Sequence, residues 1–144
     1  MENRILVLDD QQALSDLIAK IATGCGYQAK QAVDSEVFFR LYDKWAPTHV
    51  VLDLQMPHVD GIEMMRHLAE RHCRAKVLIA SGMGGKFIDS AQRLGIERGL
   101  DMAGTLQKPF RAAELRAILD EIKIDTHWCT AAHLSAAIER GELC

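Results

Sequence analysis

Five polar residues stand at the ends of strongly apolar runs, where buried strands are expected to finish. They are Asp9, Asp10, Asp53, Ser81 and Lys108. Carboxylates held together repel one another unless a cation neutralises them, and oxygen ligands of this kind favour Mg2+ or Mn2+. A hydroxyl and an ammonium beside such a metal suit a phosphoryl group, whose transfer depends on positioning and charge neutralisation. Aspartate is a covalent acceptor in this type of chemistry, which makes Asp53 the candidate.

Each of these residues alone has an ordinary structural explanation. An aspartate after a strand is usually a turn or helix-capping residue, and a lone serine or lysine there carries no information. The combination is harder to dismiss, because these residues follow four separate runs whose interiors are strongly apolar. We therefore favour the functional interpretation.

The elements that must position these residues alternate along the chain. Four runs are apolar on both sides, as strands of a covered parallel sheet should be: Ile5–Leu8, Val50–Leu52, Val77–Ala80 and Ala103–Leu106. A fifth run, Tyr27–Val33, interleaves polar residues and suits an exposed edge strand. The alternation of strand and helix, five times over, predicts an α/β fold with a doubly wound parallel sheet.

Five amphipathic faces separate or follow these strands. Helical spacing relates Leu14, Leu17, Ile18 and Ile21; Phe38, Leu41, Tyr42 and Trp45; Ile62, Met65, Leu68 and Ala69; Ile88, Ala91 and Leu94; and Leu115, Ile118, Leu119 and Ile122. A short further helix is predicted around Ala131, Leu134 and Ile138. Sheets of this type place their site at the carboxyl ends of the strands.

The composition limits the class of protein. The chain has 144 residues, a formal net charge of −3, 49% apolar and 26% charged residues. It fits one domain with a short appendage, and it has no basic cluster to neutralise the phosphates of nucleic acid. No apolar run approaches the roughly 20 residues that span a bilayer, and no signal peptide is apparent. We expect a cytoplasmic protein with no membrane segment, no direct nucleic-acid contact and no disulfide framework for its scattered cysteines.

Several motifs together resemble the receiver (REC) domain of bacterial two-component response regulators. They are Asp9-Asp10, Asp53 with Gln55-Met56-Pro57 and Asp60-Gly61, Ser81-Gly82, and Lys108-Pro109-Phe110. The match runs from about Arg4 to Ile122. The resemblance implies a flavodoxin-like, five-stranded sheet of order 2-1-3-4-5 flanked by five helices, which agrees with a polar second strand at the edge.

The resemblance also implies a role for each site residue. Asp53 would accept the phosphoryl group and bind Mg2+ directly, together with Asp10 and the backbone carbonyl of Gln55, while Asp9 would act through water. Lys108 would pair with a phosphoryl oxygen. Ser81 and the backbone N–H of Gly82 would donate hydrogen bonds to other phosphoryl oxygens, and the Lys108-Pro109 peptide bond would be cis.

The partners implied are a sensor histidine kinase or phosphotransfer protein and an attached output domain. Homodimerisation is left open. Catalysis would be limited to self-phosphorylation and self-dephosphorylation, so the module is not expected to be an enzyme. One position departs from the family, since Thr105 stands where receivers usually carry a switch aromatic. The sequence therefore predicts an atypical readout.

The region after Ser81 and the tail of the chain resemble receivers attached to EAL-type cyclic di-GMP phosphodiesterases. Ser81 and Lys108 are a few positions further apart than usual, and residues 133–143 resemble the first helix of an EAL domain. We divide the chain into a receiver domain, 1–123, and a linker with the start of an output domain, 124–144. The catalytic residues of an EAL domain are absent, so the chain itself would not cleave the dinucleotide.

Three alternatives remain. A stand-alone receiver would act by protein-protein interaction. An aspartate-nucleophile phosphatase would need a general-acid aspartate where Gln55 stands. A flavin-binding module of similar topology would need a phosphate loop after the first strand, where Asp9 and Asp10 would repel a phosphate unless a metal intervened.

Overall fold

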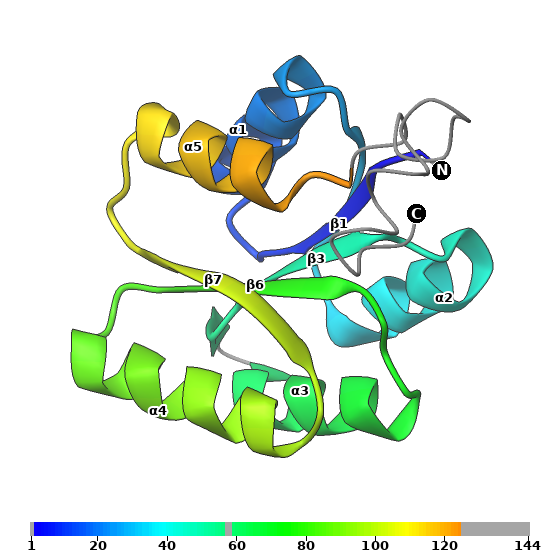
Figure 1. The fold of residues 1–144 in the computed structure, drawn as a ribbon, viewed down its shortest axis with the longest axis vertical. Helices are drawn as coiled ribbons and strands as arrows, with labels where there is room; N and C mark the ends of the chain where they lie inside the picture. The colour runs from blue at the N-terminus through cyan, green and yellow to red at the C-terminus, as the bar shows by residue number, and fades with distance from the viewer. Residues whose placement is uncertain (1, 57–58, 125–144) are drawn as a thin grey trace, which may run out of the picture.

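Five helices alternate with the strands of one sheet in the computed structural model, which describes residues 2–56 and 59–124 (Figure 1). The strands of this sheet are β1 (Arg4–Leu8), β2 (Gln28–Ala32), β3 (His49–Asp53), β6 (Lys76–Ser81) and β7 (Asp101–Gln107). The helices are α1 (Gln12–Gly24), α2 (Ser35–Trp45), α3 (Gly61–Glu70), α4 (Gly85–Glu97) and α5 (Ala112–Ile122). A short antiparallel pair, β4 (Gln55–Met56) and β5 (Val59–Asp60), precedes α3.

The sheet is parallel throughout and has the order β2-β1-β3-β6-β7. This confirms the predicted doubly wound fold, with the polar strand β2 at one edge. The register aligns Leu8 with Leu52, Asp53 with Ala80, and Ser81 with Gln107. The residues that end these strands therefore meet along one edge of the sheet.

Alternating side chains of the buried strands build a separate core on each face. Ile5 and Val7 of β1 belong to a cluster with residues of α1 and α5, whereas Leu6 and Leu8 belong to one with residues of α2, α3 and α4. In Figure 1, α1 and α5 accordingly cover one face of the sheet and the other three helices the opposite face. Continuous apolar strands are explained by burial on both faces.

Some details differ from the sequence-based expectations. Leu17, placed on the inner face of its helix by periodicity, is 43% exposed, because α1 packs through Ile18, Ile21 and Ala22. The pair β4 and β5 was not expected. Two predictions lie outside the described residues: the short helix around residues 131–138, with all of the predicted output segment after Ile124, and the role of Pro57. Among the residues described, no helix is long and apolar enough to cross a bilayer.

Buried polar groups fasten the end of α5 to the amino edge of the sheet. The Tyr27 hydroxyl donates to the Leu119 carbonyl at 2.6 Å, and His49 Nε2 lies 2.8 Å from the Ile122 carbonyl. His49 Nδ1 lies 2.7 Å from Thr48 Oγ1, so each ring nitrogen has a partner. The Asn3 side chain donates to the carbonyl of Ile124, just after α5, and accepts from the N–H of the same residue. These bonds satisfy carbonyls that the helix end would otherwise leave unpaired.

Acid should destabilise the fold through His49. Burial lowers the pKa of this imidazole below its ordinary 6.5, so the unfolded chain takes up a proton that the folded protein resists. The free energy of unfolding should therefore fall as the pH drops below about 6.5, at up to about 1.4 kcal/mol per pH unit, and should not depend on this group above it.

Urea denaturation of the wild type and His49→Gln between pH 7.5 and 5 checks this. The variant should lose stability less steeply below pH 6.5, because glutamine has no group that takes up a proton in this range. Equal slopes would mean that His49 does not resist protonation.

Candidate functional site

Three carboxylates converge where β1 and β3 end. Ligand oxygens of Asp9, Asp10 and Asp53 all lie within 4.8 Å of one another. Asp9 and Asp53 are buried, at 1% and 2% exposure, whereas Asp10 is open to solvent. The structure thus brings together the aspartates that the sequence singled out, with one side of the cluster accessible.

Backbone hydrogen bonds fix the two buried carboxylates in the same way. Asp9 Oδ1 accepts from the N–H of Gln11, and Asp53 Oδ1 accepts from the N–H of Gln55, each at 2.9 Å. Such bonds to a residue two positions later are typical of aspartate at a turn. They orient each carboxylate at the point where the chain leaves its strand.

Lys108, which follows β7, contacts two of the carboxylates. Its backbone N–H donates to the Ser81 carbonyl at 2.8 Å, which holds the end of β7 beside the end of β6. Its Nζ lies 3.2 Å from Asp9 Oδ2 and 3.3 Å from Asp53 Oδ1, with the side chain 16% exposed. The Lys108-Pro109 peptide bond is cis, as the resemblance implied. The predicted lysine is therefore in contact with the candidate acceptor.

The site carries more negative charge than its lysine compensates. Three carboxylates and one ammonium leave two negative charges when all are ionised. Burial raises the pKa of Asp9, and so does the neighbouring Asp53 carboxylate, while the N–H of Gln11 and the Lys108 ammonium act in the opposite direction. A divalent cation would remove this excess charge.

Ser81 and Gly82, predicted to donate to a phosphoryl group, lie beside the cluster with partners of their own. Ser81 is fully buried, and its Oγ accepts from the N–H of Met83 at 3.0 Å. The N–H of Gly82 donates to the side-chain Oε1 of Gln55. Sequence reasoning assigned Gln55 only a backbone role and missed this contact. No periodicity or motif in the sequence indicates it, because the two residues are distant along the chain.

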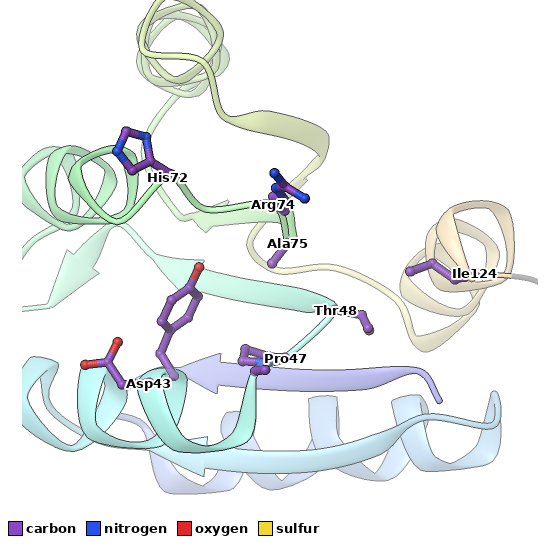
Figure 2. Close-up of a pocket in the computed structure, with 9 residues that line it drawn as sticks. Asp43, Pro47, Thr48, His72, Arg74, Ala75 and Ile124 are labelled. Atoms are coloured by element: carbon purple, nitrogen blue, oxygen red, sulfur yellow. The ribbon is translucent and has the colours of Figure 1, made fainter. Parts of the chain in front are cut away.

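A surface cavity offers a competing location for a site. It has a volume of about 530 Å³, and Figure 2 shows residues that line it; Asp9, Asp10 and Asp53 are not among them. Thr48 and Ala75, which line it, immediately precede β3 and β6, so it opens at the amino edge of the sheet. Asp43, His72 and Arg74 also line it, but they show no comparable convergence of buried charges.

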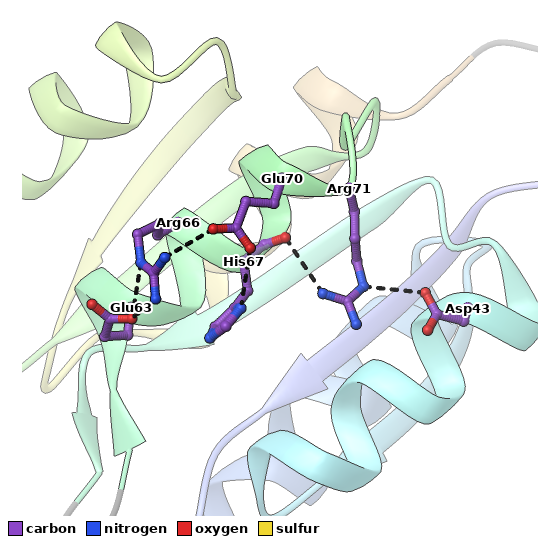
Figure 3. Close-up of polar contacts among 6 residues, drawn as sticks. All are labelled: Asp43, Glu63, Arg66, His67, Glu70 and Arg71. Carbon is purple, nitrogen blue, oxygen red and sulfur yellow. Dashed lines mark hydrogen bonds and ion pairs between the residues drawn. The ribbon is translucent and has the colours of Figure 1, made fainter.

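Charged residues of α3, together with Arg71 just after it and Asp43 of α2, form a second polar cluster. Arg66 pairs with Glu63 at 2.6 Å and with Glu70 at 2.8 Å, and Arg71 contacts Asp43 of α2 at 3.3 Å (Figure 3). All of these side chains are at least a third exposed, so water and salt screen the pairs. They are a solvated network rather than a site.

Comparisons with known proteins agree with this geometry. A family model for the response regulator receiver domain matches residues 5–120. The DNA-binding dual master transcriptional regulator RpaA of Synechocystis sp. is 35% identical over 116 residues, which cover 79% of this chain and 46% of RpaA. The response regulator MprA of Mycolicibacterium vanbaalenii is 32% identical over 143 residues, covering 99% of this chain and 60% of MprA. A response regulator from Colwellia psychrerythraea superposes with a TM-score of 0.71 at 30% identity, covering 85% of this chain and 97% of that one.

The chain therefore belongs to the response regulator receiver domain family, and it spans about half the length of the curated relatives it matches. Receiver domains bind Mg2+ at a cluster of aspartates, and this chain has such a cluster. The donors fit the ion, since carboxylate oxygens are the ligands that Mg2+ prefers. When bound, the ion neutralises oxyanions at the site.

Removing a carboxylate should weaken Mg2+ binding. Asp9→Asn and Asp10→Asn each take one negative charge from the cluster while keeping nearly the same shape, so the affinity should fall by about tenfold or more. Isothermal titration calorimetry measures it, with Asp89→Asn on the exposed face of α4 as the matched control. If both site variants bind Mg2+ as the control does, the cluster is not the metal site.

Proposed function

We propose that this receiver domain takes a phosphoryl group onto Asp53, from the phosphohistidine of a sensor histidine kinase or of a phosphotransfer protein. The observation that carries the proposal is the contact of 3.3 Å between Lys108 Nζ and the buried carboxylate of Asp53, inside a cluster of three aspartates. A buried acceptor with a fixed cation beside it is suited to accumulating phosphoryl charge.

The transfer is a displacement at phosphorus. An oxygen of Asp53 forms a P–O bond as the P–N bond of the donor phosphohistidine breaks, and the released imidazole nitrogen takes up a proton. The Lys108 ammonium compensates the charge of the transferred group. Asp10, Asp53 and the backbone carbonyl of Gln55 would hold Mg2+ directly, and Asp9 would act through water. The Ser81 hydroxyl would donate a hydrogen bond to a phosphoryl oxygen. Hydrolysis of the acyl phosphate by water would return Asp53 to its carboxylate.

We infer no turnover of an external phosphoester. An aspartate-nucleophile phosphatase needs a general acid two positions after the nucleophile, and the Gln55 carboxamide cannot supply a proton in that way. The domain is then a switch with self-phosphorylation and slow self-dephosphorylation as its only reactions. A phosphoester turnover assay would contradict this if it showed sustained catalysis that depends on Asp53.

The output that the switch controls has two candidates. RpaA is named as a DNA-binding transcriptional regulator, which favours a DNA-binding output domain. The resemblance of residues 133–143 to the first helix of an EAL domain favours a cyclic di-GMP phosphodiesterase, but it rests on residues outside those described, and no relative named above supports it. In a longer protein that contains this receiver, a Glu-Ala-Leu motif or a helix-turn-helix pattern beyond Cys144 would separate the two.

Transmission of the signal is expected to differ from that of receivers with a switch aromatic. Thr105 is half-buried and pairs with Ile79 in the register of β6 and β7. A threonine there has no ring whose rotation could report the state of Ser81. A different two-state contact must then couple phosphorylation to the surface.

Loss of the Asp53 carboxylate should abolish phosphorylation of the domain. Asp53→Ala and Asp53→Asn remove the nucleophilic carboxylate, so neither should be labelled by a phosphorylated histidine kinase or phosphotransfer protein, or bind beryllofluoride in the presence of Mg2+. Asp89→Asn is the matched control and should be labelled like the wild type. Labelling of Asp53→Ala at the wild-type level would overturn the assignment.

A further inference from the structure

The side chain of Gln55 accepts a hydrogen bond from a backbone N–H group, that of Gly82, close to the candidate phosphoryl acceptor Asp53. Its backbone is fixed by two contacts: the N–H donates to Asp53 Oδ1 at 2.9 Å, and β4 pairs Gln55 with Asp60 of β5. From this anchored backbone the carboxamide reaches across to the turn after β6, where Oε1 accepts from the N–H of Gly82. One residue therefore contacts both the acceptor carboxylate and the opposite wall of the site.

The backbone at Gly82 is open only because this residue lacks a side chain. A Cβ there would lie 2.8 Å from Gln55 Oε1 and 3.9 Å from Lys108 Cβ. Gly82 also directly follows Ser81, the last residue of the strand that pairs with β3. The carboxamide oxygen thus occupies the space next to the Gly82 backbone, on a residue whose own N–H contacts the candidate acceptor Asp53.

We propose that the Gln55 carboxamide is a built-in placeholder, which holds the Gly82 N–H until a phosphoryl oxygen displaces it. The inference rests on the proposed function of Asp53. A phosphoryl oxygen carries more negative charge than a carboxamide oxygen and accepts the stronger hydrogen bond. Gln55 is exposed, so its side chain exchanges the Gly82 contact for water at little cost when it leaves.

The placeholder lowers the affinity of the site for a phosphoryl-like ligand. Only molecules in which Gln55 has released Gly82 are competent to bind, so the apparent affinity is reduced by that fraction. One hydrogen bond of ordinary strength corresponds to roughly a two- to tenfold change in an equilibrium constant. The displacement is also a two-state contact of the kind that a receiver without a switch aromatic requires.

Beryllofluoride titration at saturating Mg2+ tests the placeholder. Gln55→Ala and Gln55→Asn keep the backbone contact with Asp53 but withdraw the carboxamide from Gly82, and both should bind roughly two- to tenfold more tightly than the wild type. Gln11→Ala is the matched control, because Gln11 makes the same backbone contact with Asp9 and its side chain is exposed; its affinity should not change. Unchanged or weaker binding in both Gln55 variants would overturn the proposal.

Hydrogen exchange of the Gly82 amide, measured without metal or beryllofluoride, tests the Gln55 contact independently of the proposed function of Asp53. Removing the acceptor should make this amide exchange roughly two- to tenfold faster in Gln55→Ala than in the wild type. Equal exchange rates would overturn the placeholder even if beryllofluoride binds. If exchange accelerates but no protein binds beryllofluoride, the contact is real and the proposed function of Asp53 is what fails.

Discussion

Repulsion among three carboxylates is the constraint on which the rest of this structure depends. Asp9, Asp10 and Asp53 meet at one edge of the sheet, and two of them are buried. One lysine compensates only part of their charge, so the ionised site is poised to take a divalent cation and then an anionic group. The apolar strands behind the site supply the rigidity that holds like charges at this separation.

The two edges of the sheet have different roles, one structural and one functional. At the amino edge, the side chains of Tyr27 and His49 contact carbonyls at the end of α5, and the Tyr27 hydroxyl and both ring nitrogens of His49 have partners. At the carboxyl edge, hydrogen bonds instead fix the carboxylates and the turn at Gly82 while the Asp10 side stays open to solvent. The first arrangement stabilises the fold, and the second leaves room for chemistry.

The sequence was sufficient for the sheet and for the convergence of the aspartates. Both follow from short-range pattern, because parallel strands that are apolar on both faces must end at a common edge. It was insufficient for Leu17, whose exposure depends on how α1 lies on the sheet, and for the strands β4 and β5. The contact between Gln55 and Gly82 depends on a rotamer and on a turn distant along the chain, and neither leaves a trace in periodicity.

The central claim is that Asp53 becomes an acyl phosphate. The most direct measurement is incubation with Mg2+ and a small phosphodonor such as acetyl phosphate, followed by borohydride reduction, which converts a phosphorylated aspartate to homoserine, and peptide mass spectrometry. The account predicts homoserine at position 53 and at none of the other aspartates. Homoserine at Asp9 or Asp10 in place of Asp53, or no homoserine from protein shown by calorimetry to bind Mg2+, would contradict it.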